Sequence, residues 1–257
     1  MELLISLSIA LGLCVGVGAG VWLQRILPEP HRSPESKDIV IVGIGALGML
    51  AGLVLGLLIA ATTDDFNKKA TDIDHFSSSL IQLDRVLANY GPAAAGARAD
   101  LKRYAVLKLS TVWPDEGGMT DEAAQKLDAA KSPHALETIG AGIRDLKPSG
   151  AVQTGLQSRA LDIYSRLSDA QWSMAADNGN SLQTVFLVIL VFWLMVMFTG
   201  LGVYAPRNAT VMLFLFFCAV SFAGAIYVML EMDGPFSGLI TISSGPMHDA
   251  LNQMGQP

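Results

Sequence analysis

Four long hydrophobic runs, two near each end, flank a polar middle segment in this chain of 257 residues. The uncharged runs cover residues 3–23, 39–63, 182–204 and 209–230. A helix of about 20 apolar residues crosses the hydrocarbon core of a bilayer. The pattern therefore predicts an all-α membrane protein with two transmembrane hairpins, at 1–63 and 182–230.

The first run also lies where a secretory signal peptide would lie. The residues before it include Glu2 and no lysine or arginine, and Gln24 and Arg25 follow it in place of a small-residue cleavage site. We therefore expect a retained membrane anchor. Prolines and charges then fill residues 27–38, which predicts a short extended connection to the second run.

Apolar residues recur at steps of three and four in two parts of the polar middle, 64–181. Residues 62–65, Thr-Thr-Asp-Asp, are good N-caps for a helix that starts there. The first stripe is Ile73, Phe76, Leu80, Leu83, Leu87 and Tyr90, and the second is Leu156, Ala160, Ile163, Leu167, Ala170 and Met174. This spacing predicts amphipathic helices in an extramembrane helical bundle. A coiled coil with a neighbouring subunit is the alternative use of either stripe.

Glycine and proline clusters divide the bundle further. The expected helices cover residues 94–112, 120–131, 133–146 and 151–176. A tail at the membrane interface, 231–257, would follow the fourth span. Within it, residues 239–243 would form one short strand or lie along the membrane surface.

Composition excludes several function classes. The 17 lysines and arginines against 23 acidic residues give a net charge of −6, without the basic patch that nucleic acid requires. Cys14 and Cys218 both lie inside predicted spans, so we expect buried thiols and no cysteine zinc site. No catalytic motif is visible, and we expect no enzyme, cofactor or metal. Asp72, Asp74 and His75 are too few for a metal site and indicate a solvated helix face.

The first two spans each repeat glycine every four residues. These glycine zippers are Gly12, Gly16 and Gly20, and Gly48, Gly52 and Gly56. Residues four apart share one helix face, so each zipper is a smooth groove that lets another backbone approach. The grooves would pack helices within a subunit or, with several copies around an axis, line a pore without charged selectivity rings.

Several residues after the fourth span form a candidate interface loop. Glu231 and Asp233 place negative charge at a helix C-terminus, which is unfavourable by some tenths of a kcal/mol. They indicate a cation or basic partner, or simply solvated charge. Pro235, Phe236 and Gly238 predict a turn in which the ring docks at the lipid interface or plugs a groove between helices.

Charges near the spans bear on orientation. The two short connections carry Arg25, Arg32, Lys37 and Arg207, whereas Lys68 and Lys69 are the basic residues beside the membrane on the other side. The excess of Lys and Arg in short loops marks the cytoplasmic side. The count favours an extracytoplasmic helical domain, with the protein in a bacterial inner membrane.

Four stretches resemble the DUF4239, or bestrophin-like, membrane protein family. They are residues 64–69, 101–104, 204–208 and 231–238. The sequence departs from the family at 71–74, where Thr-Asp-Ile-Asp replaces a stretch similar to Glu-Ala-Asn, which puts any role of that position in doubt.

The resemblance has functional implications that the residues alone do not give. Bestrophins are pentameric anion channels, so it implies a homo-oligomer that passes small inorganic ions through a lipid bilayer. It also implies a cytosolic soluble part, opposite to the loop charges. The alternative is a non-conducting membrane scaffold or sensor whose helical domain binds a partner.

Overall fold

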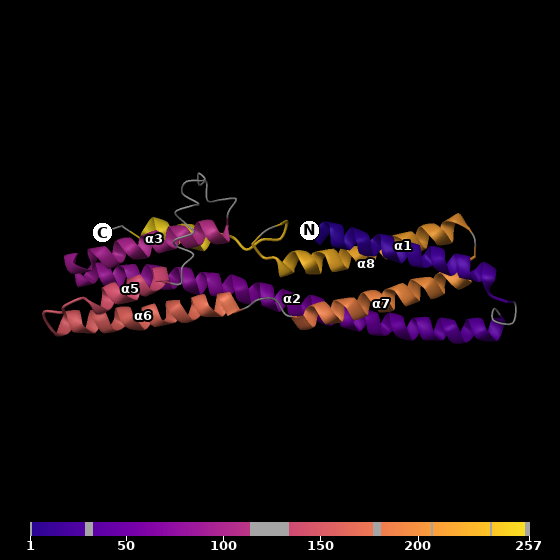
Figure 1. Ribbon diagram of the computed structural model, residues 1–257, viewed down its shortest axis with the longest axis horizontal. Helices are drawn as coiled ribbons and strands as arrows, with labels where there is room; N and C mark the ends of the chain where they lie inside the picture. The colour runs from indigo at the N-terminus through magenta and orange to yellow at the C-terminus, as the bar shows by residue number, and fades with distance from the viewer. Residues whose placement is uncertain are drawn as a thin grey trace. The chain divides into compact units, whose positions relative to one another are not determined.

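The computed structural model describes residues 2–28, 33–113, 134–176, 181–206, 208–236 and 238–254. The chain divides into two compact units. The membrane unit comprises residues 1–66 and 179–234, and the helical unit comprises residues 67–178 and 235–257. The described residues hold helices and no β-strand (Figure 1), so the predicted all-α class is confirmed.

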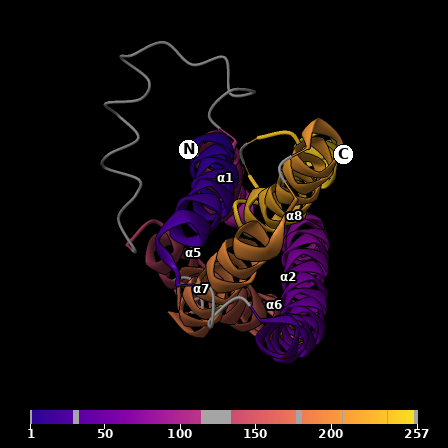
Figure 2. The ribbon, with the colours of Figure 1, turned by 90° about the vertical axis from the view of Figure 1, so that its right-hand side faces the viewer.

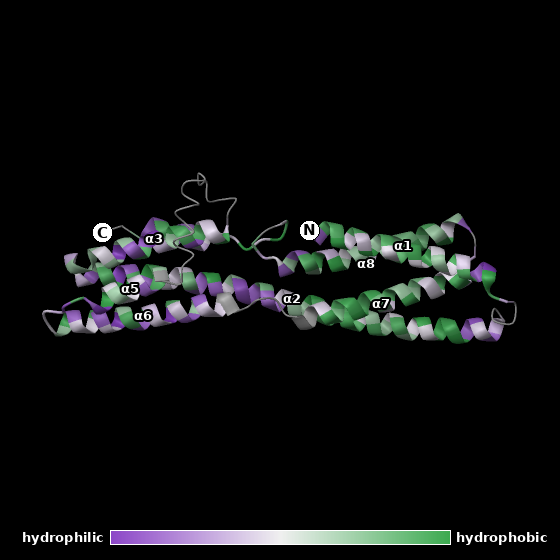
Figure 3. Ribbon diagram, viewed as in Figure 1, coloured by the Kyte–Doolittle hydropathy of each residue, from purple (hydrophilic) through white to green (hydrophobic). Residues whose placement is uncertain are grey.

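The membrane unit contains four helices that are long and apolar enough to cross a bilayer. They are α1 (Glu2–Ile26), the first part of α2 (Pro34–Tyr90), α7 (Ser181–Tyr204) and α8 (Ala209–Asp233). Hydrophobic residues dominate all four (Figure 3). The Asn208 side chain starts α8 by accepting a hydrogen bond of 2.8 Å from the backbone nitrogen of Val211.

Helix α7 contacts both N-terminal helices of the membrane unit. Leu190, Leu194 and Phe198 of α7 are fully buried, and the Phe198 ring meets the edge of Phe222 at 6.1 Å. Viewed along the helices, α7 and α8 lie between α1 and α2 (Figure 2). The core of the unit therefore forms around α7.

The helical unit contains the remainder of α2 and several shorter helices. These are η2 (Pro92–Ala94), α3 (Ala95–Val112), α5 (His134–Arg144), α6 (Ala151–Ala176) and α9 (Gly245–Gln253). Gly91, with a φ of 107°, ends α2 at the predicted break. The predicted helix at 120–131 lies outside the described residues.

Both predicted stripes face the inside of the helical unit. All six residues of the first stripe are at most 3 % exposed. In the second stripe, Ala160, Ile163 and Leu167 are buried, Leu156 and Ala170 are half-buried, and the side chain of Met174 is not described. Packing within the chain accounts for these stripes without a neighbouring subunit.

The predicted helix start at 62–65 is wrong. Helix α2 continues through these residues, and the Thr63 hydroxyl donates a hydrogen bond of 2.8 Å to the Ile59 carbonyl one turn earlier. No glycine or proline occurs between residues 57 and 90, so nothing breaks the helix there. The connection before α2 is also shorter than predicted, since α2 begins at Pro34.

Residues 239–243 do not form the short strand that was one of the two expectations for them. They form a loop, and helix α9, which the sequence pattern did not predict, follows it. Met247 and Ala250 of α9 are buried in the helical unit. The two turns of α9 are too short for a clear apolar period, and tertiary packing decides their structure.

Candidate functional site

The first glycine zipper packs against α7. A Cβ atom added at Gly16 would lie 3.2 Å from the Thr199 hydroxyl oxygen. A Cβ added at Gly20 would overlap the Thr199 carbonyl and lie 2.8 Å from the Cα of Gly202. The backbones of α1 and α7 therefore touch here, which only glycine permits.

In the second zipper, the first glycine packs against α7 and the other two do not. A Cβ atom at Gly48 would lie 3.5 Å from the sulfur of Met197 in α7. Atoms added at Gly52 or Gly56 would meet nothing within 4 Å. The C-terminal two-thirds of this zipper is consequently free of contacts within the chain as the structure describes it.

The membrane-spanning part of α2 has one packed face and one uncovered face. Ala51, Leu55 and Leu58 are buried on the packed face. We define the open face of α2 as the exposed residues Val42, Gly45, Met49, Gly52, Leu53, Gly56 and Leu57. Met49 is 81 % exposed and Leu53 is 62 % exposed.

Helix α2 is the least covered of the four candidate spans. Only 11 % of its apolar window is buried, compared with 22–28 % in the other three. The open face carries methyl groups and bare backbone and no charge. A path lined by it would be restricted by apolar side chains, not selected by a charged ring.

The candidate interface loop lies in two different environments. Glu231, at the end of α8, is only 6 % exposed and has a polar contact, whereas Asp233 is exposed. Pro235, which begins the C-terminal part of the helical unit, is buried. The loop therefore begins with one enclosed and one solvated carboxylate.

Phe236 packs against Trp113 at the end of α3. The two rings meet edge to face at 5.6 Å, and the Trp113 Nε1 donates a hydrogen bond of 2.9 Å to the Ile242 carbonyl. The Ile242 nitrogen donates to the Pro235 carbonyl at 2.8 Å, and Gly238 has a φ of 113° in this closed loop. The sequence pattern assigned no role to Trp113 and did not predict this contact.

Residues 101–104 place buried side chains on one side of α3 and exposed basic side chains on the other. Leu101 and Tyr104 are buried, and Lys102 and Arg103 are exposed. The Tyr104 hydroxyl donates a hydrogen bond to the Gln171 side chain, and burial raises the pKa of Tyr104. This stretch joins α3 to α6 through a neutral phenol.

A partly buried ion pair joins α2 to α3. The Arg98 guanidinium donates two hydrogen bonds of 2.9 Å to the Asp84 carboxylate, whose side chain is 6 % exposed. This hydrogen bonding raises the pKa of Arg98.

Among the described residues, no three His, Cys, Asp or Glu side chains are placed so that they could hold a metal ion. This holds for Asp72, Asp74 and His75 as well.

Four apolar spans, an open glycine face and a separate helical unit together define an integral membrane protein of the helical class. Residues 11–247 match the Bestrophin-like domain. The chain therefore belongs to the Bestrophin-like family.

Solved structures share this fold. A bacterial bestrophin homologue from Klebsiella pneumoniae is 14 % identical, with a TM-score of 0.66 and complete coverage of both chains. A tryptophan-to-alanine variant of that homologue is 16 % identical, with a TM-score of 0.63, over 95 % of this chain and 97 % of that one. No curated protein matches this chain in sequence.

Proposed function

We propose that this chain is a subunit of a homo-oligomeric ion channel in which the open face of α2 surrounds the conduction path. The uncovered Gly52 and Gly56 carry the proposal, because close packing explains the other zipper and none of the residues that the structure describes packs against these two. Copies arranged around an axis would place this face at a shared centre.

Membership of the Bestrophin-like family supports the proposal. Bestrophins are anion channels, so small inorganic anions are the proposed substrates. The apolar open face would hold the path narrow, and flux would be limited by its largest side chains.

A non-conducting scaffold is the second candidate. Val152 and Trp172 of α6 are 78 % and 65 % exposed, so the helical unit presents apolar side chains that a partner protein would cover. A scaffold would need these side chains and would show no ion flux.

Chloride flux into proteoliposomes separates the two candidates. We expect flux above that of empty liposomes, and a several-fold increase for Leu53→Ala, because the change widens an apolar constriction. Leu11→Ala is the matched control, since Leu11 is 65 % exposed on α1, outside the proposed path. Flux equal to that of empty liposomes for every protein would overturn the channel.

We propose further that the helical unit lies outside the cytoplasm of a bacterial inner membrane. The four basic residues of the short connections, against Lys68 and Lys69, support this orientation. The test is Lys147→Cys in a background where Cys14 and Cys218 are alanine. Labelling in intact spheroplasts by a membrane-impermeant maleimide is expected; labelling only after lysis would reverse the orientation.

A further inference from the structure

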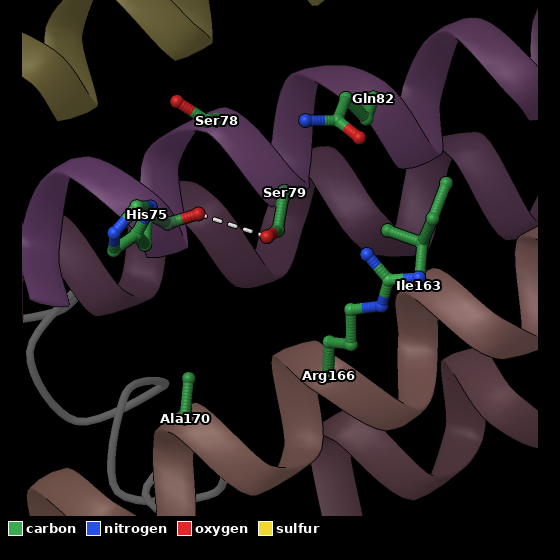
Figure 4. Close-up of a pocket in the computed structure, with 7 residues that line it drawn as sticks. All are labelled: His75, Ser78, Ser79, Gln82, Ile163, Arg166 and Ala170. Carbon is green, nitrogen blue, oxygen red and sulfur yellow. Dashed lines mark hydrogen bonds between the residues drawn. The ribbon is translucent and has the colours of Figure 1, made fainter.

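A polar groove lies between α2 and α6 within the helical unit. Its volume is about 270 Å³. Four polar residues of α2 and one of α6 line it, together with the buried Ile163 (Figure 4). The groove is separate from the open face of α2 in the membrane unit.

Hydrogen-bond donors line both sides of this groove. His75, Ser78 and Gln82 follow one another at steps of three and four, so they share one face of α2. Arg166 reaches from α6 toward that face (Figure 4). The seven lining residues include no carboxylate, and Arg166 brings a guanidinium to the groove.

Most of these donors are available to a ligand. The side chains of Ser78 and Gln82 make no hydrogen bond to another described residue. Arg166 uses one terminal nitrogen for an ion pair of 2.5 Å with Asp162, and its side chain is 69 % exposed. A guanidinium has five N–H donors in a planar fork, so several remain for an oxyanion.

We propose that this groove binds a phosphate group, either free or carried on a small organic body. A phosphate accepts hydrogen bonds on several oxygens, which suits a groove lined by a guanidinium from α6 and by a hydroxyl and an amide from α2. Ile163 and Ala170 give the organic body an apolar floor. The site is independent of ion conduction and would attach a ligand to the helical unit.

Isothermal titration of the full-length protein in detergent, at constant ionic strength, tests the site. The probes are inorganic phosphate, glycerol phosphate and phosphatidic acid in mixed micelles with the same detergent. Saturable binding of either soluble phosphate supports a free ligand, and binding of phosphatidic acid alone identifies a lipid headgroup as the source. No saturable binding to any probe overturns the proposal.

Substitutions locate the binding in the groove. Gln82→Glu puts a carboxylate among the donors, and Arg166→Gln removes the charge; each should weaken binding at least about tenfold. Arg159→Gln is the matched control, because Arg159 is exposed on α6 and does not line the groove. Thermal unfolding checks that each variant is folded. An equal effect of Arg159→Gln, or none from folded Gln82→Glu, would place binding elsewhere.

Discussion

Individual glycines have different roles in the two N-terminal spans. Gly20 and Gly202 let the backbones of α1 and α7 touch, whereas a Cβ atom added at Gly18 or Gly52 would meet nothing within 4 Å. The four-residue period predicted a smooth groove in each span. It could not tell which groove a neighbouring helix of the same chain fills, because that depends on contacts between distant segments.

At Gly20, even one methyl group should destabilise the membrane unit. Gly20→Ala would push against the backbone of α7, which cannot move aside as a side chain can, and we expect a loss of about 1–3 kcal/mol. Thermal unfolding in detergent measures the change. Gly18→Ala is the control and should be neutral or stabilising, since its Cβ meets open space. Equal effects at both positions would contradict the packing.

A second prediction for single residues concerns the Asp84–Arg98 ion pair. Asp84→Asn leaves the Arg98 guanidinium without its buried carboxylate, and we expect a loss of about 2–3 kcal/mol in the free energy of unfolding. Chemical denaturation measures the loss. Asp100→Asn, which breaks the exposed pair with Arg103, should cost at most about 0.5 kcal/mol. A small loss from Asp84→Asn would show that the pair contributes little.

Among the elements, α2 and the C-terminal segment differ most from the sequence prediction. The stripe from Ile73 to Tyr90 was predicted because burial on one helix face imposes a period on the sequence. The continuation of α2 through residues 62–65 was not predicted, because Thr and Asp favour helix caps over helix interiors and so indicated a helix start there. Helix α9 and the Trp113–Phe236 contact depend on tertiary packing and leave no periodic signal.

Trp113 should hold the C-terminal segment on α3. Trp113→Phe keeps a ring beside Phe236 but removes the donor to the Ile242 carbonyl, and we expect a loss of about 1–2 kcal/mol. Hydrogen exchange should become faster in residues 238–254. Trp172→Phe, at a 65 % exposed position, is the control and should change neither quantity. Unchanged exchange in Trp113→Phe would mean that other contacts hold the segment.

For the whole molecule, the four spans were predictable from the length of their apolar runs. The helical bundle was predictable from the spacing of its apolar residues. The proposed assembly surface was not, because both zippers share the same spacing. The close approaches at Gly16 and Gly20, and their absence at Gly52 and Gly56 among the described residues, distinguish the two zippers.

Assembly should depend on the open face of α2. Gly52→Leu adds a side chain where the subunit itself has room, so we expect the subunit to fold and the oligomer to dissociate. Size-exclusion chromatography with light scattering measures the shift. Gly18→Leu is the control, as its position on α1 is equally open, and it should leave the oligomer intact. An unchanged oligomer in Gly52→Leu, together with unchanged chloride flux, would show that this groove faces lipid.

The mass of the detergent-solubilised particle, measured by native mass spectrometry, tests the central claim most directly. A homo-oligomeric channel predicts a closed ring of about five subunits, in which α2 from each copy can face one axis. A monomer or dimer would leave the open face of α2 without an axis to surround, and would contradict the proposed channel.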